Sequence, residues 1–189
     1  MLNFPENYRE LLRAAIASID TAKVAQAIAW FREVRAEGRT AFIAGNGGSA
    51  ATAAHFVCDM LKGASYGRPQ RFRIMALHDN IPTLTAYSND ACYEVAIAEQ
   101  LRNFAQPGDL YMAISGSGNS PNVVLAMEAA AELGCRTIAL TGRDGGRLGP
   151  LAQLHIHVPE PHMGRIEDAH MVVCHMIAYY FMEEAGEGC

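Results

Sequence analysis

A polar loop at residues 115–121 is the part of the sequence best suited to hold an anion. Hydroxyl and amide side chains alternate there with glycines, in the order Ser115, Gly116, Ser117, Gly118, Asn119 and Ser120. A helical pattern over residues 122–130 follows, and Pro121 fits its first position, which makes Ser120 the expected N-cap. Free N–H groups at a helix N-terminus favour phosphate, and an ordinary capped turn needs only one polar side chain. We therefore expect a phosphate site in this loop.

Two further segments carry titratable side chains at helical spacing. His55 and Asp59 stand four residues apart in a predicted helix over residues 50–62, so both side chains emerge on one face. Such a pair could bind a metal or act in acid–base catalysis. For this helix alone, a satisfied core histidine with an interface salt bridge is the better explanation of the pattern.

The second segment is the last predicted helix, over residues 166–183. It is largely apolar but contains four titratable groups, Glu167, Asp168, His170 and His175. An apolar helix should not bury such groups without partners. The Glu-x-x-His spacing favours Glu167 with His170 as metal ligands, whereas Glu167 and His175 lie about 80° apart around the helix. Spacing does not choose between the two histidines, and a buried core histidine remains an alternative.

These side chains must be positioned by alternating strands and helices. Short apolar runs predict strands at residues 40–44, 72–77, 109–114, 137–141 and 154–158. Helical patterns between them predict helices over residues 50–62, 91–104 and 122–130, with a loop at residues 87–90 before the second. Such alternation is typical of an α/β fold with a parallel sheet between helices, in which ligands bind at the carboxyl ends of the strands.

Two more glycine-rich loops fall at this expected edge of the sheet. Gly-Asn-Gly-Gly-Ser follows the first strand at residues 45–49, and Gly-Arg-Asp-Gly-Gly follows the fourth at residues 142–146. The first matches neither the P-loop nor the dinucleotide fingerprint, so alone it fits a plain turn as well as a ligand loop. Because several loops converge on one edge, a shared ligand site is the better interpretation of each.

Residues 6–37 precede the first strand and read as two amphipathic helices that meet at residues 18–21. Helices in this position have no preceding strand to pack on. We expect them either to cover a face of the sheet after it has formed or to pack on another subunit, and we favour oligomerisation. We assign residues 1–189 to a single domain. Residues 1–38 form its N-terminal helical segment, and residues 39–189 form the core and the C-terminal helix.

Composition narrows the class of protein. A chain of 189 residues, half of them apolar, suits one domain with a substantial core. The net charge of −5 argues against a general nucleic-acid surface. The five cysteines are scattered without a C-x-x-C pair, so we expect neither a disulfide framework nor a zinc ribbon. No apolar run approaches a membrane span and the N-terminus does not resemble a signal peptide, so we expect a cytoplasmic protein without membrane contact.

At these motifs the sequence resembles the sugar-isomerase (SIS) domain family, and within it the phosphoheptose isomerases. The resemblance covers nearly the whole chain and is carried by residues 45–50, 55, 89–90, 107–109, 115–123, 140–146, 158–159 and 165–166. It implies a three-layer fold with a five-stranded parallel sheet, and a homotetramer with active sites at subunit interfaces. It also implies an aldose–ketose isomerase that converts sedoheptulose 7-phosphate to glycero-manno-heptose 7-phosphate through an ene-diol.

The resemblance further implies roles for single residues. The substrate contacts would come from Asn46, Gly47, Gly48, Ser49, Asn89, Asp90, Ser115, Gly116, Ser117, Ser120 and Glu167. The ligands of a divalent metal, with zinc as the first choice, would be His55, Asp59, Glu167 and His175. Asp59 would be the base and His175 the acid. Asp59 stands where the family has glutamate and Glu167 where it has glutamine, and since both types can bind metal, we interpret the site as retuned.

Two other functions stay open. One is a non-catalytic SIS protein that binds a sugar phosphate and regulates a partner, and the other is an isomerase of a different ketose phosphate. Catalytically silent members of the family have lost the carboxylate and histidine of the site. The presence of His55, Asp59, Glu167 and His175 here therefore argues against the first alternative.

Overall fold

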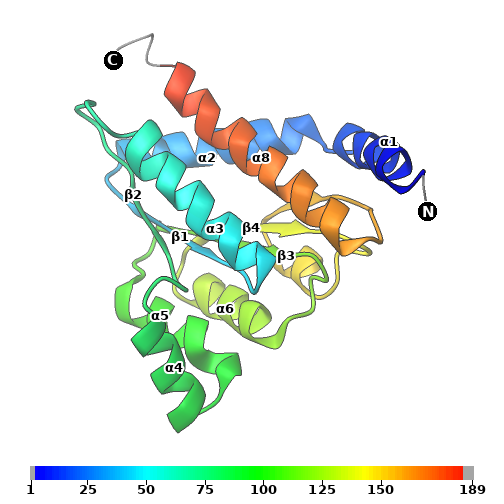
Figure 1. Ribbon diagram of the computed structural model, residues 1–189. Coiled ribbons are helices and arrows are strands. Elements are labelled where there is room, and N and C mark those ends of the chain that lie inside the picture. The colour runs from blue at the N-terminus through cyan, green and yellow to red at the C-terminus, as the bar shows by residue number, and fades with distance from the viewer. Residues whose placement is uncertain (1–2, 185–189) are drawn as a thin grey trace.

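Five parallel strands form one sheet within residues 3–184, the part of the chain that the computed structural model describes. Their order across the sheet is β2–β1–β3–β4–β5 (Figure 1). They are β1 (Thr40–Ala44), β2 (Arg73–Ala76), β3 (Leu110–Ser115), β4 (Arg136–Thr141) and β5 (Leu154–His157). The predicted α/β fold with a five-stranded parallel sheet between helices is confirmed. Cys189, one of the five cysteines counted above, lies outside the described residues.

The central strand, β3, is buried at every position. It pairs with β1 on one side, where Ala113 lies opposite Ala44, and with β4 on the other, where Ser115 lies opposite Thr141. The chain therefore builds the sheet outward in one direction from β1 and in the other from β3. Ligands of open α/β sheets bind at the carboxyl ends of the strands beside such a reversal.

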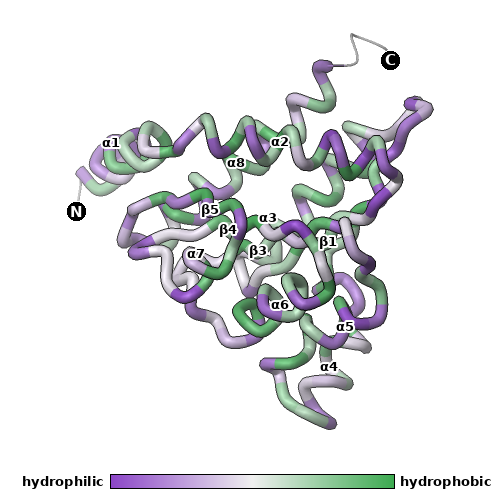
Figure 2. The backbone as a smooth tube through the Cα atoms, turned by 180° about the vertical axis from the view of Figure 1, so that it is seen from behind, coloured by the Kyte–Doolittle hydropathy of each residue, from purple (hydrophilic) through white to green (hydrophobic). Residues whose placement is uncertain are grey.

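Helices cover both faces of the sheet because side chains of a strand alternate between two apolar surfaces. One face, with Ile43 and Met112, packs against α2 (Thr21–Ala36), α3 (Gly48–Cys58) and α8 (Met163–Glu183). The other face, with Phe42 and Tyr111, packs against α5 (Ala96–Phe104) and α6 (Pro121–Glu132). Figure 2 shows the strands lying between these two layers of helices.

The two predicted N-terminal helices are present as α1 (Phe4–Ala17) and α2. They are separated by Asp20, whose carboxylate caps α2 by accepting the N–H groups of Ala22 (3.0 Å) and Lys23 (3.2 Å). α1 packs along α8, and Ala15 is its only buried residue. Phe4, in its first turn, is 61% exposed. The contact of this helix with a second subunit stays a prediction.

The prediction of a loop at residues 87–90 is wrong. These residues end a helix, α4 (Ile81–Asp90), which begins where Asn80 accepts the N–H of Thr83 at 3.1 Å and Pro82 fixes the first turn. A short 3₁₀ turn, η2 (Tyr93–Val95), then leads into α5. Strong local capping therefore outweighed the polar, turn-like composition of the segment.

Other helices differ from their predicted extents, and α5, expected from residue 91, begins at Ala96. The helix predicted over residues 50–62 is α-helical only to Cys58 and continues as a π-helix, η1 (Asp59–Gly63). α8 begins at Met163, three residues before the predicted start, and the four-residue α7 (Leu148–Leu151) was too short to give a periodic signal. Among the described helices, none is both long and apolar enough to cross a membrane.

Candidate active site

The serine-rich loop, residues 115–120, connects β3 to α6 at the carboxyl edge of the sheet. Ser115 is 4% exposed, and its carbonyl and hydroxyl oxygens both accept the N–H of Gly118, at 3.1 and 3.2 Å. Ser117 Oγ accepts the N–H of Asn119 at 3.2 Å. Ser120 stands at the predicted N-cap, but within residues 3–184 its hydroxyl makes no capping bond. That hydroxyl is therefore available to a ligand at the start of α6.

A second glycine-rich loop, residues 142–146, packs directly on the serine-rich loop. Gly118 has a φ of +64°, and a Cβ there would collide with the backbone of residues 142–146. Leu148 donates its N–H to the carbonyl oxygen of Gly118, and Arg147 donates its N–H to Asn119 Oδ1, both at 3.0 Å. Because residue 118 is glycine, the backbone of the serine-rich loop can touch that of residues 142–146. These contacts fix the loop that carries the serine hydroxyls.

An open cavity of about 460 Å³ lies between these two loops and the segment that leads into α8. Its walls are formed by Ser117, Asn119, Arg143, Asp144, Pro159 and Pro161. Hydroxyl, amide, guanidinium and carboxylate groups thus face one concave space, as in binding sites for small polar molecules. Of the residues predicted to bind phosphate, Ser117 lies on this wall.

Asn46 joins the loop after β1 to the serine-rich loop. Its side-chain amide exchanges two hydrogen bonds of 2.8 Å with that of Asn122, in the first turn of α6. Tyr93 donates its hydroxyl hydrogen to Asn46 Oδ1 at 2.7 Å. Neither partner was predicted: Asn122 was visible as a polar residue in an apolar helical pattern, but nothing in the sequence marks Tyr93. These bonds tie the two loops together between β1 and β3.

The predicted residues Gly47, Gly48 and Ser49 form the entry to α3. Ser49 is buried in the first turn, and Gly47, at φ +53°, has open space where a Cβ would stand. The carboxylate of Glu167 lies over Gly48, since a Cβ on that glycine would be 2.7 Å from Glu167 Oε2. A carboxylate in this position faces the positive end of the α3 dipole.

Asn89 and Asp90, also predicted to contact substrate, lie apart from the serine-rich loop at the end of α4. Asn89 Nδ2 donates to Asp90 Oδ1 at 2.8 Å. Asp90 lines a different cavity, of about 380 Å³, together with Thr83, Ala86, Tyr87 and Ala91. Within this chain the structure does not bring Asn89 and Asp90 to the cavity that Ser117 lines.

His55, Asp59 and His175 converge where α3 packs against α8, and their ligand atoms all lie within 4.8 Å of one another. His55 Nε2 is 3.1 Å from His175 Nε2 and 3.3 Å from Asp59 Oδ2, and His175 Nε2 is 3.8 Å from that oxygen. Around a tetrahedral zinc ion with ligands at about 2.1 Å, neighbouring ligand atoms are about 3.4 Å apart. The three side chains therefore fit a zinc-like cation, with an open position left for water or substrate.

Glu167, the fourth predicted ligand, is outside this group. It precedes His175 by eight residues, roughly 12 Å along α8. Its carboxylate lies beside Gly48, at the start of α3, instead. His175 rather than His170 belongs to the group, a choice that spacing alone did not make. The structure thus brings together three of the four residues predicted to bind metal.

His170 is fully buried on the inner face of α8. Within residues 3–184 neither of its ring nitrogens has a hydrogen-bond partner. Burial lowers the pKa of His170 to about 4, so its imidazole is neutral at physiological pH. It is a core histidine, and the Glu-x-x-His spacing does not identify the cluster.

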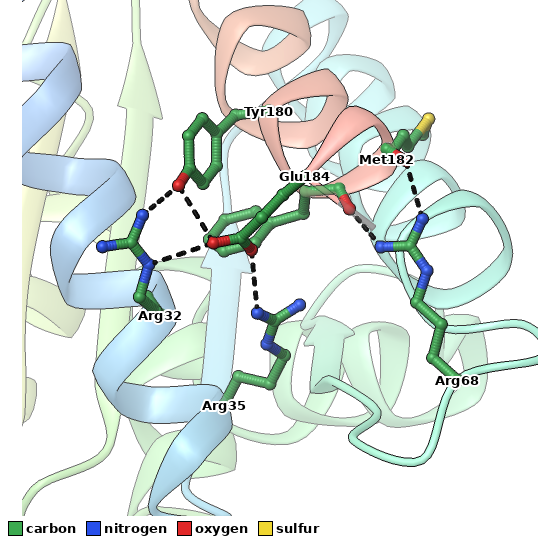
Figure 3. A network of polar contacts seen from close by, with 7 residues as sticks. Arg32, Arg35, Arg68, Tyr180, Met182 and Glu184 are labelled. Atoms are coloured by element: carbon green, nitrogen blue, oxygen red, sulfur yellow. Dashed lines mark hydrogen bonds and ion pairs between the residues drawn. The ribbon is translucent and has the colours of Figure 1, made fainter. Parts of the chain in front are cut away.

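The position of His175 depends on how α8 is fixed at its ends. At the start, Arg165 Nη2 donates to Glu160 Oε1 at 2.7 Å, with both side chains largely buried. At the end, Arg68 Nη2 donates to the carbonyl oxygen of Met182 at 2.8 Å (Figure 3). An arginine here satisfies carbonyl groups that a helix end leaves free. The histidine lies between these two anchors.

Glu184 completes the anchor at the end of α8. Its carboxylate lies 3.1 Å from Arg35 Nη2 and 3.5 Å from Arg32 Nε, and Tyr180 donates its hydroxyl hydrogen to it at 3.0 Å (Figure 3). Arg35 is also stacked on Phe181, 4.8 Å from the ring centre. Arginines of α2 thereby hold the last turn of α8 against the body of the protein.

Comparison with known proteins gives the class of the chain. The family model described as SIS domain matches residues 3–142. A probable phosphoheptose isomerase of Thermoplasma volcanium is 46% identical over 133 residues, 70% of this chain and 67% of the relative. A phosphoheptose isomerase of Mycobacterium tuberculosis is 41% identical over 172 residues, 91% of this chain and 83% of the relative. The chain therefore belongs to the SIS domain family.

Within that family, the similarity is to phosphoheptose isomerases in structure as well. The structure of a phosphoheptose isomerase from Francisella tularensis superposes with a TM-score of 0.89 at 26% sequence identity. The superposition covers 96% of this chain and 98% of that one. The whole fold, from α1 to α8, is thus shared with an enzyme of this type.

Proposed function

We propose that this protein is an aldose–ketose isomerase of a phosphorylated sugar, and that its substrate is sedoheptulose 7-phosphate. The product would be glycero-manno-heptose 7-phosphate. The observation that carries the proposal is the convergence of two imidazoles and a carboxylate, from His55, Asp59 and His175, in a chain similar to phosphoheptose isomerases. A purely sugar-binding protein has no need of such a group.

A divalent cation, with zinc as the first choice, would be held by His55 Nε2, Asp59 Oδ2 and His175 Nε2, and bound there it would polarise the carbonyl oxygen of the sugar. The support is the donor set and its spacing of 3.1 to 3.8 Å. The carboxylate of Glu167, on α8, lies beside the start of α3. We propose Glu167 as a contact to the substrate, and as a fourth metal ligand if the site rearranges to bring this carboxylate to the cation.

The chemical step moves one proton between neighbouring carbons. Asp59 would accept the proton from C1 of the ketose, and the resulting ene-diol would take a proton back at C2. His175 would give and take the proton on the oxygen atoms. Because a nitrogen that binds a cation carries no proton, His175 Nε2 acts as acid only when it is not a ligand. The metal content of a His175→Ala variant distinguishes the two roles.

The serine-rich loop would hold the phosphate, with hydroxyls of Ser115, Ser117 and Ser120 and the backbone of Gly116 as donors. Neutral donors preorganised in this way fix one end of the substrate, so that the other end meets the base in a defined position. Sugar hydroxyls would be bound by Asn46 and by the backbone of residues 47–49.

Asn89 and Asp90 would serve the site of another subunit. They end α4, a helix with no buried residue, and lie away from the cavity of Ser117. This supports a homo-oligomer, with a tetramer as our proposal, whose active sites are shared between subunits. We also propose that the enzyme acts in the cytoplasm.

The test is to incubate the purified protein with sedoheptulose 7-phosphate in D₂O. We expect deuterium at C2 of the aldose product, about one divalent metal per chain, and loss of turnover on chelation without loss of the folded state. A metal-free protein that binds sedoheptulose 7-phosphate but exchanges no proton would support the regulatory alternative. Turnover of a shorter ketose phosphate alone would correct the substrate and keep the reaction.

A further inference from the structure

The serine-rich loop balances only part of the charge of its proposed ligand. A phosphate monoester carries about −1.5 to −2 charges at neutral pH. The loop supplies neutral hydroxyl and N–H donors, and the N-terminus of α6 adds only about half a positive charge. A cation at the cavity that Ser117 lines would balance the remaining charge.

Arg143 is the cation that lines this cavity. It takes part in none of the ion pairs formed among residues 3–184. The neighbouring arginines are engaged: Arg165 lies 2.7 Å from Glu160, and Arg147 lies 3.8 Å from Glu128. Arg143 alone among them keeps its charge free for a ligand.

The cavity also contains one carboxylate, that of Asp144. Its Oδ1 accepts the N–H of Gly146 at 3.1 Å, a bond that holds the turn of this loop. Although Asp144 is adjacent in sequence to Arg143, the two side chains form no ion pair with each other in the described structure. The acidic group is therefore tied to the backbone of its own loop, and the guanidinium is not neutralised by it.

The backbone of Arg143 gives an independent argument. Its φ is +48°, and among residues 3–184 it is the one non-glycine residue with a positive φ. Such a conformation is unfavourable for a side chain and easy for glycine, the residue found at three of the five positions of this loop. The local contacts are made by main-chain atoms: the N–H donates to Glu160 O at 3.1 Å and the carbonyl accepts from His157 Nε2 at 2.9 Å. Glycine would keep both bonds, so the fold alone gives no reason for arginine here.

We propose that Arg143 binds the phosphate of the substrate from the wall of the cavity that Ser117 also lines, and so selects phosphorylated over free sugars. The inference rests on the phosphate site of the proposed function. Arginine suits this task because its planar guanidinium donates two parallel hydrogen bonds to phosphate oxygens. The strained loop then has a function, because it aims this side chain into the cavity.

The test compares Arg143→Gly with the wild type for binding of inorganic phosphate and of sedoheptulose 7-phosphate by calorimetry. Affinity for both should fall roughly ten- to a hundredfold, since a charge-assisted contact is lost. The melting temperature without ligand should stay the same or rise, because glycine relieves the strained backbone. Arg143→Gln, which keeps the strain and removes the charge, should lose the same affinity. Arg147→Gln, on the adjoining turn, is the matched control and should bind as the wild type does.

The outcomes separate this inference from the proposed reaction. If Ser117→Ala weakens phosphate binding and both Arg143 variants do not, Arg143 has no role and the serine-rich loop keeps its own. If the Arg143 variants bind weakly but the wild type isomerises no sugar phosphate, the inference stands and the proposed reaction is wrong. A lower melting temperature of Arg143→Gly with unchanged affinity would assign the arginine to the fold. A wild type that binds no phosphate would overturn both.

Discussion

The serine-rich loop and the cluster of His55, Asp59 and His175 hold their functional groups in different ways. The loop lies at the sheet edge, where its backbone touches residues 142–146 and Ser115 is 4% exposed. The cluster lies on helix surfaces, and its two imidazole side chains are 50% and 42% exposed. The proposed phosphate site is therefore fixed by main-chain packing, whereas the geometry of the cluster depends on the relative position of α3 and α8.

The cluster is also displaced along α3 from the loop that Asn46 ties to the first turn of α6, just after the serine-rich loop. His55 follows Gly48, the first residue of α3, by seven residues, which is roughly 10 Å along a helix. A substrate that spans the two regions must be extended, with its phosphate at one end and its reacting carbons at the other. Variants that disable one region without the other test whether the two act on one molecule.

The largest effect is expected for Asp59→Asn, which keeps the size of the side chain and removes its charge. If Asp59 is the base, turnover should fall by at least ~100-fold, while KM changes far less because the phosphate contacts remain. Steady-state kinetics with sedoheptulose 7-phosphate measure both values. Glu10→Gln, a carboxylate-to-amide change on α1, is the control and should be silent. Undiminished turnover in Asp59→Asn would refute the assigned base.

Gly118→Ala should break the phosphate region and spare the cluster. The added Cβ would enter the backbone of residues 142–146 at a φ of +64°, so the two loops must separate. We expect a loss of stability of a few kcal/mol and weak sugar-phosphate binding, with the bound metal per chain unchanged.

A matched control separates strain from collision. Gly67→Ala introduces the same side chain at φ +71°, where open space surrounds the added Cβ. It should lose only about 1 kcal/mol and bind sugar phosphate normally. Equal destabilisation and equal binding in the two variants would show that the contact between the loops does not position the serines.

The same contrast explains what the sequence predicts well. The serine-rich loop is visible because strand, glycines, hydroxyls and helix start lie within a few consecutive residues, and the sheet follows from the repeated alternation of such units. The cluster joins residues 120 positions apart, His55 and His175, and helical spacing on α8 favoured His170, which lies outside the cluster. The choice of His175 came from family resemblance, because local periodicity says nothing about which face of α8 meets α3.

Two other features were missed for different physical reasons. α4 was missed because capping by Asn80 and Pro82 outweighed the polar residues at its end. Tyr93 was missed because its bond to Asn46 depends on a 3₁₀ turn that has no periodic pattern. The first was a local capping signal that the polar composition outweighed in the prediction, whereas the second depends on a residue 47 positions away in the sequence.

Ser117→Ala should have a moderate effect confined to the phosphate region. Loss of one hydrogen bond to a charged group weakens binding by about 1.5–3 kcal/mol, or roughly 10- to 150-fold, if Ser117 contacts phosphate. Calorimetry with sedoheptulose 7-phosphate measures the change, and Ser88→Ala on α4, whose hydroxyl bonds only to its own helix, serves as control. Unchanged affinity in a Ser115→Ala, Ser117→Ala double variant would remove the phosphate from this loop.

The smallest effect on turnover is expected for a substitution of His170. This residue shares α8 with His175 but lies outside the cluster. Burial lowers the pKa of His170 to about 4 in the folded protein, against about 6.5 in an unfolded chain. Between these values the unfolded chain takes up a proton that the folded protein does not, so the free energy of unfolding falls as pH falls. The slope from this group is at most about 1.4 kcal/mol per pH unit.

His170→Leu should therefore flatten the pH dependence of stability between about pH 6.5 and 4 while leaving turnover at pH 7.5 near the wild-type value. Urea unfolding at pH 7, 6 and 5, at one protein concentration, gives the two slopes. The remaining histidines and carboxylates titrate in both proteins, so the difference between the slopes isolates His170. Parallel slopes would mean that the imidazole is protonated in the folded state and has a partner. A collapse of turnover comparable with that of His175→Ala would move His170 from the core into the site.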